Sequence, residues 1–278
     1  MPELPDLEAV RQFLTPRLIG RRIERVTVLI PAVVRTSRND FTALLEGRRF
    51  QAGEPVTRLG KFLLFALEGD FCLVVNPMLT GHFHYATPET QRYKRTCFSL
   101  TLDDGQELRY IDERVMGKVY LVSTAGVGSL PQISELGPDV LDPAVTEAVF
   151  AERLRRYSGQ IKDILTNQRF LAGIGNAYAD EVLWLAGIHP YRRRTTLTPE
   201  EITRLYHAIH AVMNWAIPIV KKKMQEDPAK GEWRDHLRVH RRGGQPCPRC
   251  GSPISEITAG QRVTNFCRAC QPLSDGEQ

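Results

Sequence analysis

The sequence CPRCGSPISEITAGQRVTNFCRAC, residues 247–270, contains two C-x2-C pairs separated by sixteen residues. Two hairpin turns at this spacing can place four thiolates tetrahedrally around Zn²⁺. The cysteines concerned are Cys247, Cys250, Cys267 and Cys270. Because the protein supplies all four ligands, the pattern predicts one structural zinc ion that organises a finger and does no chemistry. The alternatives are unliganded thiols and a redox pair, but the redox pair lacks its usual βαβ surroundings.

The remaining two of the six cysteines, Cys72 and Cys97, are expected to be ordinary buried thiols. The first ten residues, MPELPDLEAV, contain neither the basic nor the apolar segment of a secretory signal. No run of about eighteen apolar residues occurs in the sequence. These features predict a cytoplasmic protein that makes no membrane contact.

Length and charge limit the number of domains and the kind of binding partner. With 278 residues, 42% of them hydrophobic, the chain can form more than one core, and two domains are expected. The net charge of +5 is modest, but nine Lys and Arg stand against four Asp and Glu between Lys221 and Arg249. A charge run is usually a solvated face. Because Arg249, Arg262 and Arg268 lie on or beside the cysteine pairs, the finger is expected to contact phosphates or a nucleic-acid groove.

The first half of the chain has the pattern of a β-sandwich or barrel. From about Gly20 to Ser123, short strand-like runs such as residues 23–30 alternate with turn residues. One helix is expected before them, because apolar residues recur at helical spacing over residues 7–18. Pro5 suits its first turn and Gly20 suits its end.

Glycines and prolines over residues 126–142 predict a linker, after which the apolar period changes to that of helices. Helices are expected to open at Asp142-Pro143 and at Thr198-Pro199, and another over residues 177–186 follows a glycine turn that ends at Asn176. The predicted organisation is an N-terminal domain (residues 1–125), a linker (126–141), a helical domain (142–236) and a finger (237–273).

Four stretches, in order along the chain, resemble the formamidopyrimidine-DNA glycosylase/endonuclease VIII family. They are MPELPD (1–6), RLGKFLLF (58–65), IKDILTNQRFLAGIGNAYADEVLWLAGIHP (161–190) and VHRRGGQPCPRCG (239–251). The resemblance implies an α+β multidomain fold: an N-terminal β-sandwich with a leading helix, a helix-two-turn-helix domain and a four-Cys zinc finger. It also implies a monomer that binds double-stranded DNA containing a damaged base or an abasic site, in association with the nucleoid.

The resemblance assigns catalysis to the N-terminus. Removal of the initiator Met would expose Pro2 as a secondary amine that can attack the sugar C1′. The family then forms a Schiff base and breaks the strand by β,δ-elimination, with Glu3 as its general acid and base. Asp6 stands where the family usually has Glu, one methylene longer. Lys61 and Arg262 match residues that bond phosphates beside the lesion. Judged alone, Pro2 would merely begin a helix and Glu3 would complement the helix dipole.

A base that leaves the stack must be replaced, and the backbone must be held. The resemblance assigns the wedge to Leu79 and Met116, and contact with the orphaned base to Arg114. Met78, next to Leu79, leaves the register of the wedge open. Further DNA contacts are expected at the following residues: Lys162, Asn176, His240 and Arg262. Asn176 is also expected to cap the helix that follows it.

The lesion is the least determined property. Residues 217–231 correspond to a Gly/Ser-rich loop that closes over the flipped base in oxidised-purine enzymes, but their composition differs. We rank formamidopyrimidine and 8-oxoguanine ahead of the oxidised pyrimidines that endonuclease VIII-like enzymes remove. A damaged-DNA-binding protein without catalysis is a further alternative. A zinc-ribbon or ribosome-associated protein would explain the finger but not the first six residues.

Overall fold

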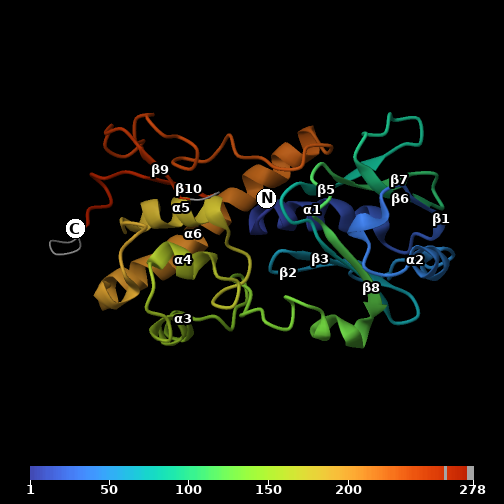
Figure 1. Cartoon of the computed structure of the whole chain (residues 1–278), viewed down its shortest axis with the longest axis horizontal. Helices are drawn as coiled ribbons and strands as arrows, with labels where there is room; N and C mark the ends of the chain where they lie inside the picture. Colours follow the sequence, from blue (N-terminus) through green and yellow to red (C-terminus); the bar gives the residue numbers. More distant parts are fainter. Residues whose placement is uncertain (260–261, 274–278) are drawn as a thin grey trace. The chain divides into compact units, whose positions relative to one another are not determined.

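A computed structural model describes residues 1–259 and 262–273 and shows an α+β fold (Figure 1). The chain divides into two compact units. Unit 1 comprises Met1–Ser134 and Ile217–Trp233, and unit 2 comprises Glu135–Ala216 and the chain from Arg234 onward. The predicted β-sandwich with a leading helix, the helical domain and the four-cysteine cluster are all present, so the predicted fold class is confirmed. Within the described ranges, no helix combines the length and the apolar character that crossing a bilayer requires.

Unit 1 is a sandwich of two four-stranded antiparallel sheets. The first sheet has the order β1 (Ile23–Val28), β6 (Thr96–Leu102), β7 (Glu107–Asp112), β5 (Gly81–Ala86). The second has the order β2 (Val56–Leu59), β3 (Phe62–Leu67), β4 (Phe71–Asn76), β8 (Lys118–Ser123). Between the sheets, the rings of Phe65 and Phe83 lie 5.0 Å apart, and the ring of Tyr110 lies 5.3 Å from that of Phe83. Such aromatic contacts add to the burial of apolar area that holds the two sheets together.

Unit 1 contains α1 (Leu4–Leu18), α2 (Arg38–Leu45), two short 3-10 helices (Pro31–Val33 and Thr124–Ser129) and the last part of α6 (Pro199–Glu226). α1 agrees with the prediction, because Pro5 lies in its first turn and Gly20 follows its end with φ of +66°. The strand expected over residues 23–30 is shorter than predicted and ends at Val28, because Pro31 begins a 3-10 turn. Cys72 and Cys97 are buried thiols, as predicted.

Unit 2 contains the remaining elements: α3 (Glu147–Arg155), α4 (Ile161–Thr166), α5 (Asn176–Ala186), a 3-10 turn (Arg194–Thr196), β9 (Ser255–Ala259), β10 (Arg262–Phe266) and the first part of α6 (Pro199–Glu226). The helix expected at Asp142 was placed too early. The carboxylate of Asp142 accepts the backbone N–H of Ala144 at 2.9 Å, which forms a turn, and Thr146 caps α3 instead. Asn176 is likewise not the cap of α5, since Gly175 is the N-cap and Asn176 is the first helical residue.

The segment expected to be a loop over residues 217–231 is mostly helix. α6 continues to Glu226, and Val220 and Met224 are buried in the core of unit 1 together with Trp233. The apolar pair lies four residues apart and therefore faces the same side of the helix. This spacing, rather than the three lysines between the two residues, decides the local structure.

The backbone at Gly81 and at Gly117 packs directly against the hydroxyl of Tyr110. A side-chain carbon at Gly81, which begins β5, would lie 2.1 Å from Oη of Tyr110, and one at Gly117, just before β8, would lie 2.0 Å from it. Both distances are far below van der Waals contact. Each glycine therefore lets the end of a loop approach the ring, and these two loops carry the predicted wedge residues.

We expect Gly117→Ala to destabilise the chain by about 2 kcal/mol or more, because the new methyl group overlaps the Tyr110 hydroxyl. That hydroxyl has no hydrogen-bond partner among residues 1–259 and 262–273, so Tyr110→Phe should cost little by itself. The double variant should recover most of the loss in urea unfolding. Gly53→Ala, where a methyl group meets nothing within 4 Å, is the control. Equal stability of Gly117→Ala and the control would contradict this account.

Candidate functional site

The first turn of α1 is held rigidly. Glu3 is the N-cap, and its backbone N–H donates to Oδ2 of Asp6 at 2.8 Å. Both side chains are buried, at 2% and 0% exposed, and Pro2 is buried immediately before them. An acidic residue at this position also complements the helix dipole. The three predicted N-terminal residues are therefore together, and the shorter Asp6 is long enough to fix the backbone of Glu3.

Lys61 lies in the tight turn between β2 and β3, next to Gly60 with φ of +56°. Arg58 anchors this turn: it donates to the carbonyl oxygen of Gly60 at 3.1 Å and lies 3.4 Å from the carboxylate of Glu8 on α1. The turn that presents Lys61 is thus tied to the helix that presents the N-terminus. Sequence reasoning did not assign Arg58, although it is part of the quoted RLGK motif.

The predicted wedge residues lie on two loops that share one buried carboxylate. Asp112, which ends β7 and is 0% exposed, accepts the hydroxyl of Thr80 and, at 2.7 Å, the backbone N–H of Gly117. The N–H of Arg114 donates to the Thr80 hydroxyl at 3.0 Å, which closes the connection. Because the carboxylate bonds both loops, they move as one body within unit 1.

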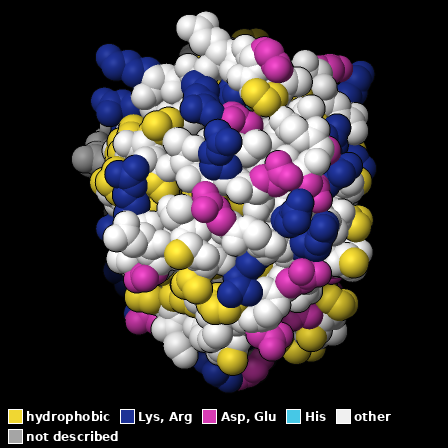
Figure 2. All heavy atoms as spheres, turned by 90° about the vertical axis from the view of Figure 1, so that its right-hand side faces the viewer, with side chains coloured by type: hydrophobic (Ala, Val, Ile, Leu, Met, Phe, Trp, Pro, Cys, Tyr) yellow, Lys and Arg dark blue, Asp and Glu magenta, His cyan; other side chains and the backbone are white. Residues whose placement is uncertain are grey.

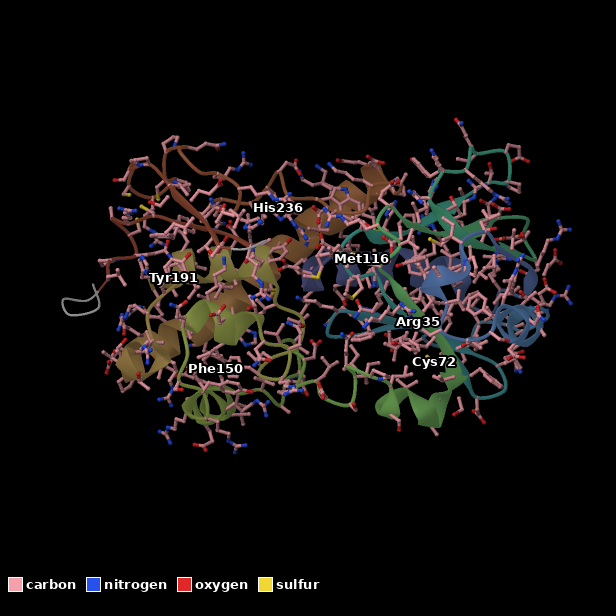
Figure 3. All side chains as sticks on the ribbon, in the orientation of Figure 1. Arg35, Cys72, Met116, Phe150, Tyr191 and His236 are labelled. Carbon is pink, nitrogen blue, oxygen red and sulfur yellow. The ribbon has the colours of Figure 1, made fainter. Side chains whose placement is uncertain are left out.

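On these loops, Leu79 is half-buried and Arg114 is exposed. Met116 is 42% exposed, which is unusual for a large apolar side chain (Figure 3). Met78 and Val115 adopt positive φ angles of 53° and 54°, so each loop is strained close to its apolar residue. Apolar side chains on rigid, strained loops are suited to insertion into a stack of bases.

In unit 2, two predicted residues, Lys162 and His240, meet at a buried acid, Asp180 on α5. The ammonium of Lys162 lies 2.6 Å from Oδ1 of Asp180, and Nδ1 of His240 donates to Oδ2 at 2.7 Å. Lys162, Asp180 and His240 are each at most 6% exposed as whole residues. Lys162 also donates to the hydroxyl of Thr264 on β10 at 2.8 Å. The network joins α4, α5 and the finger hairpin.

The hairpin itself is held at Val263, whose carbonyl oxygen accepts the side-chain amide of Asn176 at 2.7 Å. Arg262, one residue earlier, begins β10 and is 69% exposed, with Nη1 3.9 Å from the carboxylate of Asp163. Asn176 therefore positions the strand that presents Arg262, a function that its expected role as a helix cap did not suggest.

A second buried acid, Glu181, holds the chain that enters the finger. Its carboxylate accepts the backbone N–H groups of Arg238, Val239 and His240, the shortest at 2.8 Å. Burial raises the pKa of Glu181, and these three N–H groups oppose the rise. Sequence reasoning missed Asp112, Asp180 and Glu181. The available signal for the last two was an Asp-Glu pair inside the otherwise apolar helix YADEVLWLAG.

The four finger cysteines form one cluster. Their sulfur atoms all lie within 4.8 Å of one another, which fits a single tetrahedral metal ion. Hydrogen bonds from Ser252 lower the pKa of the Cys250 thiol to about 6, whereas desolvation raises the pKa of Cys270 to about 12. The indole N–H of Trp184 on α5 donates to the sulfur of Cys247 at 3.4 Å, a contact that suits a thiolate ligand. A soft tetrathiolate set of this kind selects zinc.

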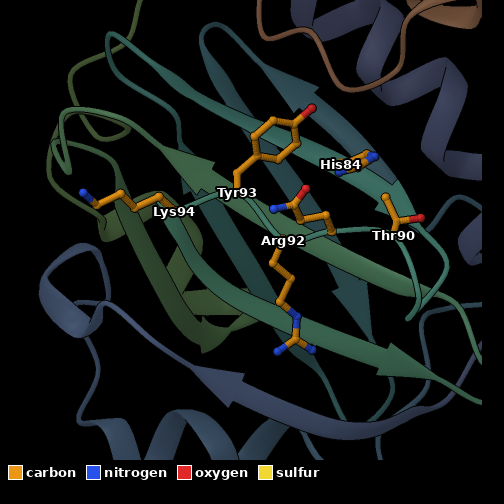
Figure 4. Close-up of a pocket in the computed structure, with 6 residues that line it drawn as sticks. His84, Thr90, Arg92, Tyr93 and Lys94 are labelled. Atoms are coloured by element: carbon orange, nitrogen blue, oxygen red, sulfur yellow. The ribbon is translucent and has the colours of Figure 1, made fainter.

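Unit 1 also has a polar pocket of about 410 Å³ beneath the loop between β5 and β6 (Figure 4). It is lined by His84, Thr90, Gln91, Arg92, Tyr93 and Lys94. Buried Arg109 holds the loop by donating to the carbonyl oxygens of Thr87 and Thr90. No predicted site residue lines this pocket. On the face shown in Figure 2, basic and acidic side chains are interspersed, unlike the single-sign field of a phosphate-binding surface.

An N-terminal β-sandwich, a helical domain and a four-cysteine finger are together the domain set of one class of DNA glycosylases. Three family models match the chain. They are the formamidopyrimidine-DNA glycosylase N-terminal domain over residues 1–119, the formamidopyrimidine-DNA glycosylase H2TH domain over 136–227, and the zinc finger found in FPG and IleRS over 244–273. The chain belongs to the formamidopyrimidine-DNA glycosylase family.

Curated relatives agree. The formamidopyrimidine-DNA glycosylase of Symbiobacterium thermophilum is 41% identical over 99% of this chain and 91% of its own length. That of Chloroflexus aurantiacus is 39% identical over 98% of each chain. Among solved structures, Lactococcus lactis Fpg (MutM) in complex with FAPY-dG-containing DNA has a TM-score of 0.88 and 32% identity, and covers 98% of this chain and 100% of its own. The same protein with AP-site DNA has a TM-score of 0.86 and 31% identity at the same coverage. The activity is that of a DNA glycosylase, and AP lyase activity is characteristic of the family.

We expect Asp180→Asn to destabilise the chain by about 3 to 5 kcal/mol, because it leaves the Lys162 ammonium buried without its anionic partner. Urea unfolding measures the loss. Asp163→Asn is the matched control, since that carboxylate is 68% exposed, and it should change stability by less than about 0.5 kcal/mol. Similar effects of the two substitutions would show that the buried network contributes little.

We expect Cys267→Ser to lower bound zinc from one ion per chain towards none and to loosen the finger, because three thiolates bind zinc far less firmly than four. Metal analysis of the purified protein measures the first effect, and protease sensitivity after residue 237 measures the second. Cys97→Ser, which alters a buried thiol in unit 1, is the control and should keep its zinc. Full zinc occupancy in Cys267→Ser would contradict the assigned ligand set.

Proposed function

We propose that this chain is a bifunctional DNA glycosylase and AP lyase that releases an oxidised base through a Schiff base at Pro2 and cuts the strand by β,δ-elimination. The observation that carries the proposal is the buried, capped turn at the N-terminus. It holds Pro2 and Glu3 at the start of α1, where loss of the initiator Met leaves a secondary amine beside a carboxyl group. A fixed nucleophile next to a proton donor is what displacement at C1′ requires.

In the first step, the nitrogen of Pro2 bonds to C1′ while the bond from C1′ to the damaged base breaks, and the base leaves with the proton released by the amine. Glu3 then donates a proton to the ring oxygen O4′ as the C1′–O4′ bond breaks, which opens the sugar and leaves an iminium. The iminium acidifies the C2′ proton. Its removal expels the 3′ phosphate, and a second elimination expels the 5′ phosphate. Asp6 acts here as a positioning residue, because its carboxylate holds the backbone of Glu3.

Contacts with DNA would come from both units. On unit 1, Leu79 and Met116 would fill the space of the flipped nucleotide, Arg114 would bond the orphaned base, and Lys61 would contact the phosphates. On unit 2, exposed Arg262 would contact phosphates. Lys162 and His240 are buried and Asn176 is half-buried, and their contacts support a different role, because they hold the hairpin that presents Arg262.

For the lesion, we propose formamidopyrimidine and 8-oxoguanine in duplex DNA, with a monomeric enzyme acting on nucleoid DNA in the cytoplasm. The names of the relatives support this choice, as does the Lactococcus lactis complex with FAPY-dG DNA. Oxidised pyrimidines are the second candidate, because the same Lactococcus lactis protein also has a structure with DNA that contains one.

We expect Pro2→Gly to reduce base release from a lesion-containing duplex at least about 100-fold, because the secondary amine that forms the iminium is lost. Single-turnover assays of base release measure this, with circular dichroism and zinc content to establish folding. Pro5→Ala, in the same first turn, is the control and should retain activity. Undiminished base release by Pro2→Gly would refute the proposed nucleophile, and normal DNA binding without covalent trapping of the unaltered protein would instead favour a damage sensor.

A panel of duplexes, each with one lesion, tests the substrate. Formamidopyrimidine and 8-oxoguanine duplexes should be cut at least about ten times faster than those with an oxidised pyrimidine, a difference of about 1.4 kcal/mol in transition-state stabilisation. The reverse order would assign the chain the preference of endonuclease VIII-like enzymes, with the chemistry at Pro2 unchanged.

A further inference from the structure

The N-terminal amine is paired with a carboxylate from the other end of unit 1. The amine nitrogen of Met1 lies 2.8 Å from Oε2 of Glu232, an ion pair that spans 231 residues of sequence. The two side chains are 35% and 33% exposed, so the pair lies at the edge of the core, accessible to a substrate. Neither the sequence motifs nor the family models include Glu232 among their matched residues.

The segment that carries Glu232 is fixed on both sides. A side-chain carbon at Gly231 would lie 2.9 Å from Nδ1 of His82 on β5, so the backbone there packs against the imidazole. That ring nitrogen also lies 3.1 Å from the carbonyl oxygen of Thr80. On the other side, Trp233 is only 2% exposed and belongs to the core of unit 1. Glu232 therefore extends from an anchored backbone toward the N-terminus.

Removal of Met1 moves the terminal nitrogen by a single residue, or about 3.8 Å of chain, so the Glu232 carboxylate lies within roughly 7 Å of the nitrogen of Pro2. At this separation a carboxylate attracts an ammonium and stabilises its charged form. On the basis of the proposed function, we propose that Glu232 is a positioning residue for the Pro2 amine. Glu232 holds the ammonium in place, accepts its proton and so sets the pH at which the amine becomes a nucleophile.

At an abasic site, Pro2 and the sugar aldehyde form the iminium without any further reactant. One of the two ammonium protons of Pro2 passes through an intervening water molecule to the Glu232 carboxylate, which frees the nitrogen lone pair. The nitrogen bonds to the aldehyde carbon C1′, and the carbonyl oxygen leaves as water with the proton from Glu232 and the remaining N–H proton. The products are an iminium, one water molecule and the regenerated carboxylate.

Other ionisable groups lie near this stretch. Glu3, the N-cap of α1, and Asp6 in its first turn follow Met1 in the chain, and His82 on β5 packs against Gly231. Asp112 and Glu113 in turn act on His82. A substitution at Glu232 leaves all of these groups unchanged, so a shift in the pH profile reports on the loss of this one charge. Without the negative charge of Glu232 the ammonium is less stable. The pKa of the amine therefore falls, and the free amine persists to lower pH.

The experiment measures the rate of imine formation, trapped by cyanoborohydride, between the mature protein and an abasic-site oligonucleotide from pH 5 to 9. For Glu232→Gln we expect the acid limb of the profile to move down by about 0.5 to 1 pH unit, and the plateau to fall severalfold because the amine is no longer held. Glu232→Asp, which keeps the charge on a shorter side chain, should give an intermediate shift. Glu226→Gln, an exposed acid at the end of α6, is the control and should leave the limb in place.

An acid limb that is unchanged in both Glu232 variants overturns the role of Glu232, and a lower plateau with an unchanged limb shows a structural effect only. Pro2→Gly measured in parallel separates the two proposals: if trapping and base release no longer depend on Pro2, the proposed function itself fails. If they depend on Pro2 while the limb does not respond to residue 232, only the inference about Glu232 fails.

Discussion

Buried carboxylates that accept backbone N–H groups hold the functional side chains of both units. In unit 1, Asp112 bonds the loops that carry Leu79 and Met116. In unit 2, Asp180 and Glu181 bond the chain on both sides of the finger hairpin. A buried carboxylate without partners is very unfavourable, so each of these loops has one favourable geometry. In the proposed function, exposed residues such as Met116 and Arg262 would contact DNA from a backbone that is already ordered, so less conformational entropy would be lost on binding.

The second constraint is that unit 1 is discontinuous in sequence. Residues 217–233 return to the β-sandwich and bury Val220, Met224 and Trp233 in its core. The same segment brings Glu232 to the N-terminal amine. α6 begins in unit 2 and ends in unit 1, so one continuous helix belongs to both units. Residues 217–233 are therefore an anchored part of unit 1 and not a free loop.

The zinc site and the buried acids both fix the position of the finger hairpin. The thiolate cluster closes the finger, and Trp184 links it to α5 through the sulfur of Cys247. From α5, Asp180 reaches both Lys162 and His240, so the position of the hairpin is set twice, by the metal and by the ion pairs. The finger needs both because a short two-stranded hairpin is only marginally stable by itself.

Sequence alone determined the zinc ligands, the leading helix, the β-sandwich and the family, because each depends on short-range spacing: paired cysteines, a helical apolar period, alternating strands and motifs of a few residues. It also predicted roles for Pro2, Glu3 and the two loops that carry Leu79 and Met116. The tertiary structure was needed to show that residues 217–226 continue a helix and that Asn176 and Lys162 hold a hairpin. It also revealed the long-range contacts of four acidic residues: Asp112, Asp180, Glu181 and Glu232. An acidic residue has the same local pattern on a solvated surface and in a buried network. Its role depends on partners that fold against it from far along the chain, such as His240 at 60 residues from Asp180 and Met1 at 231 residues from Glu232.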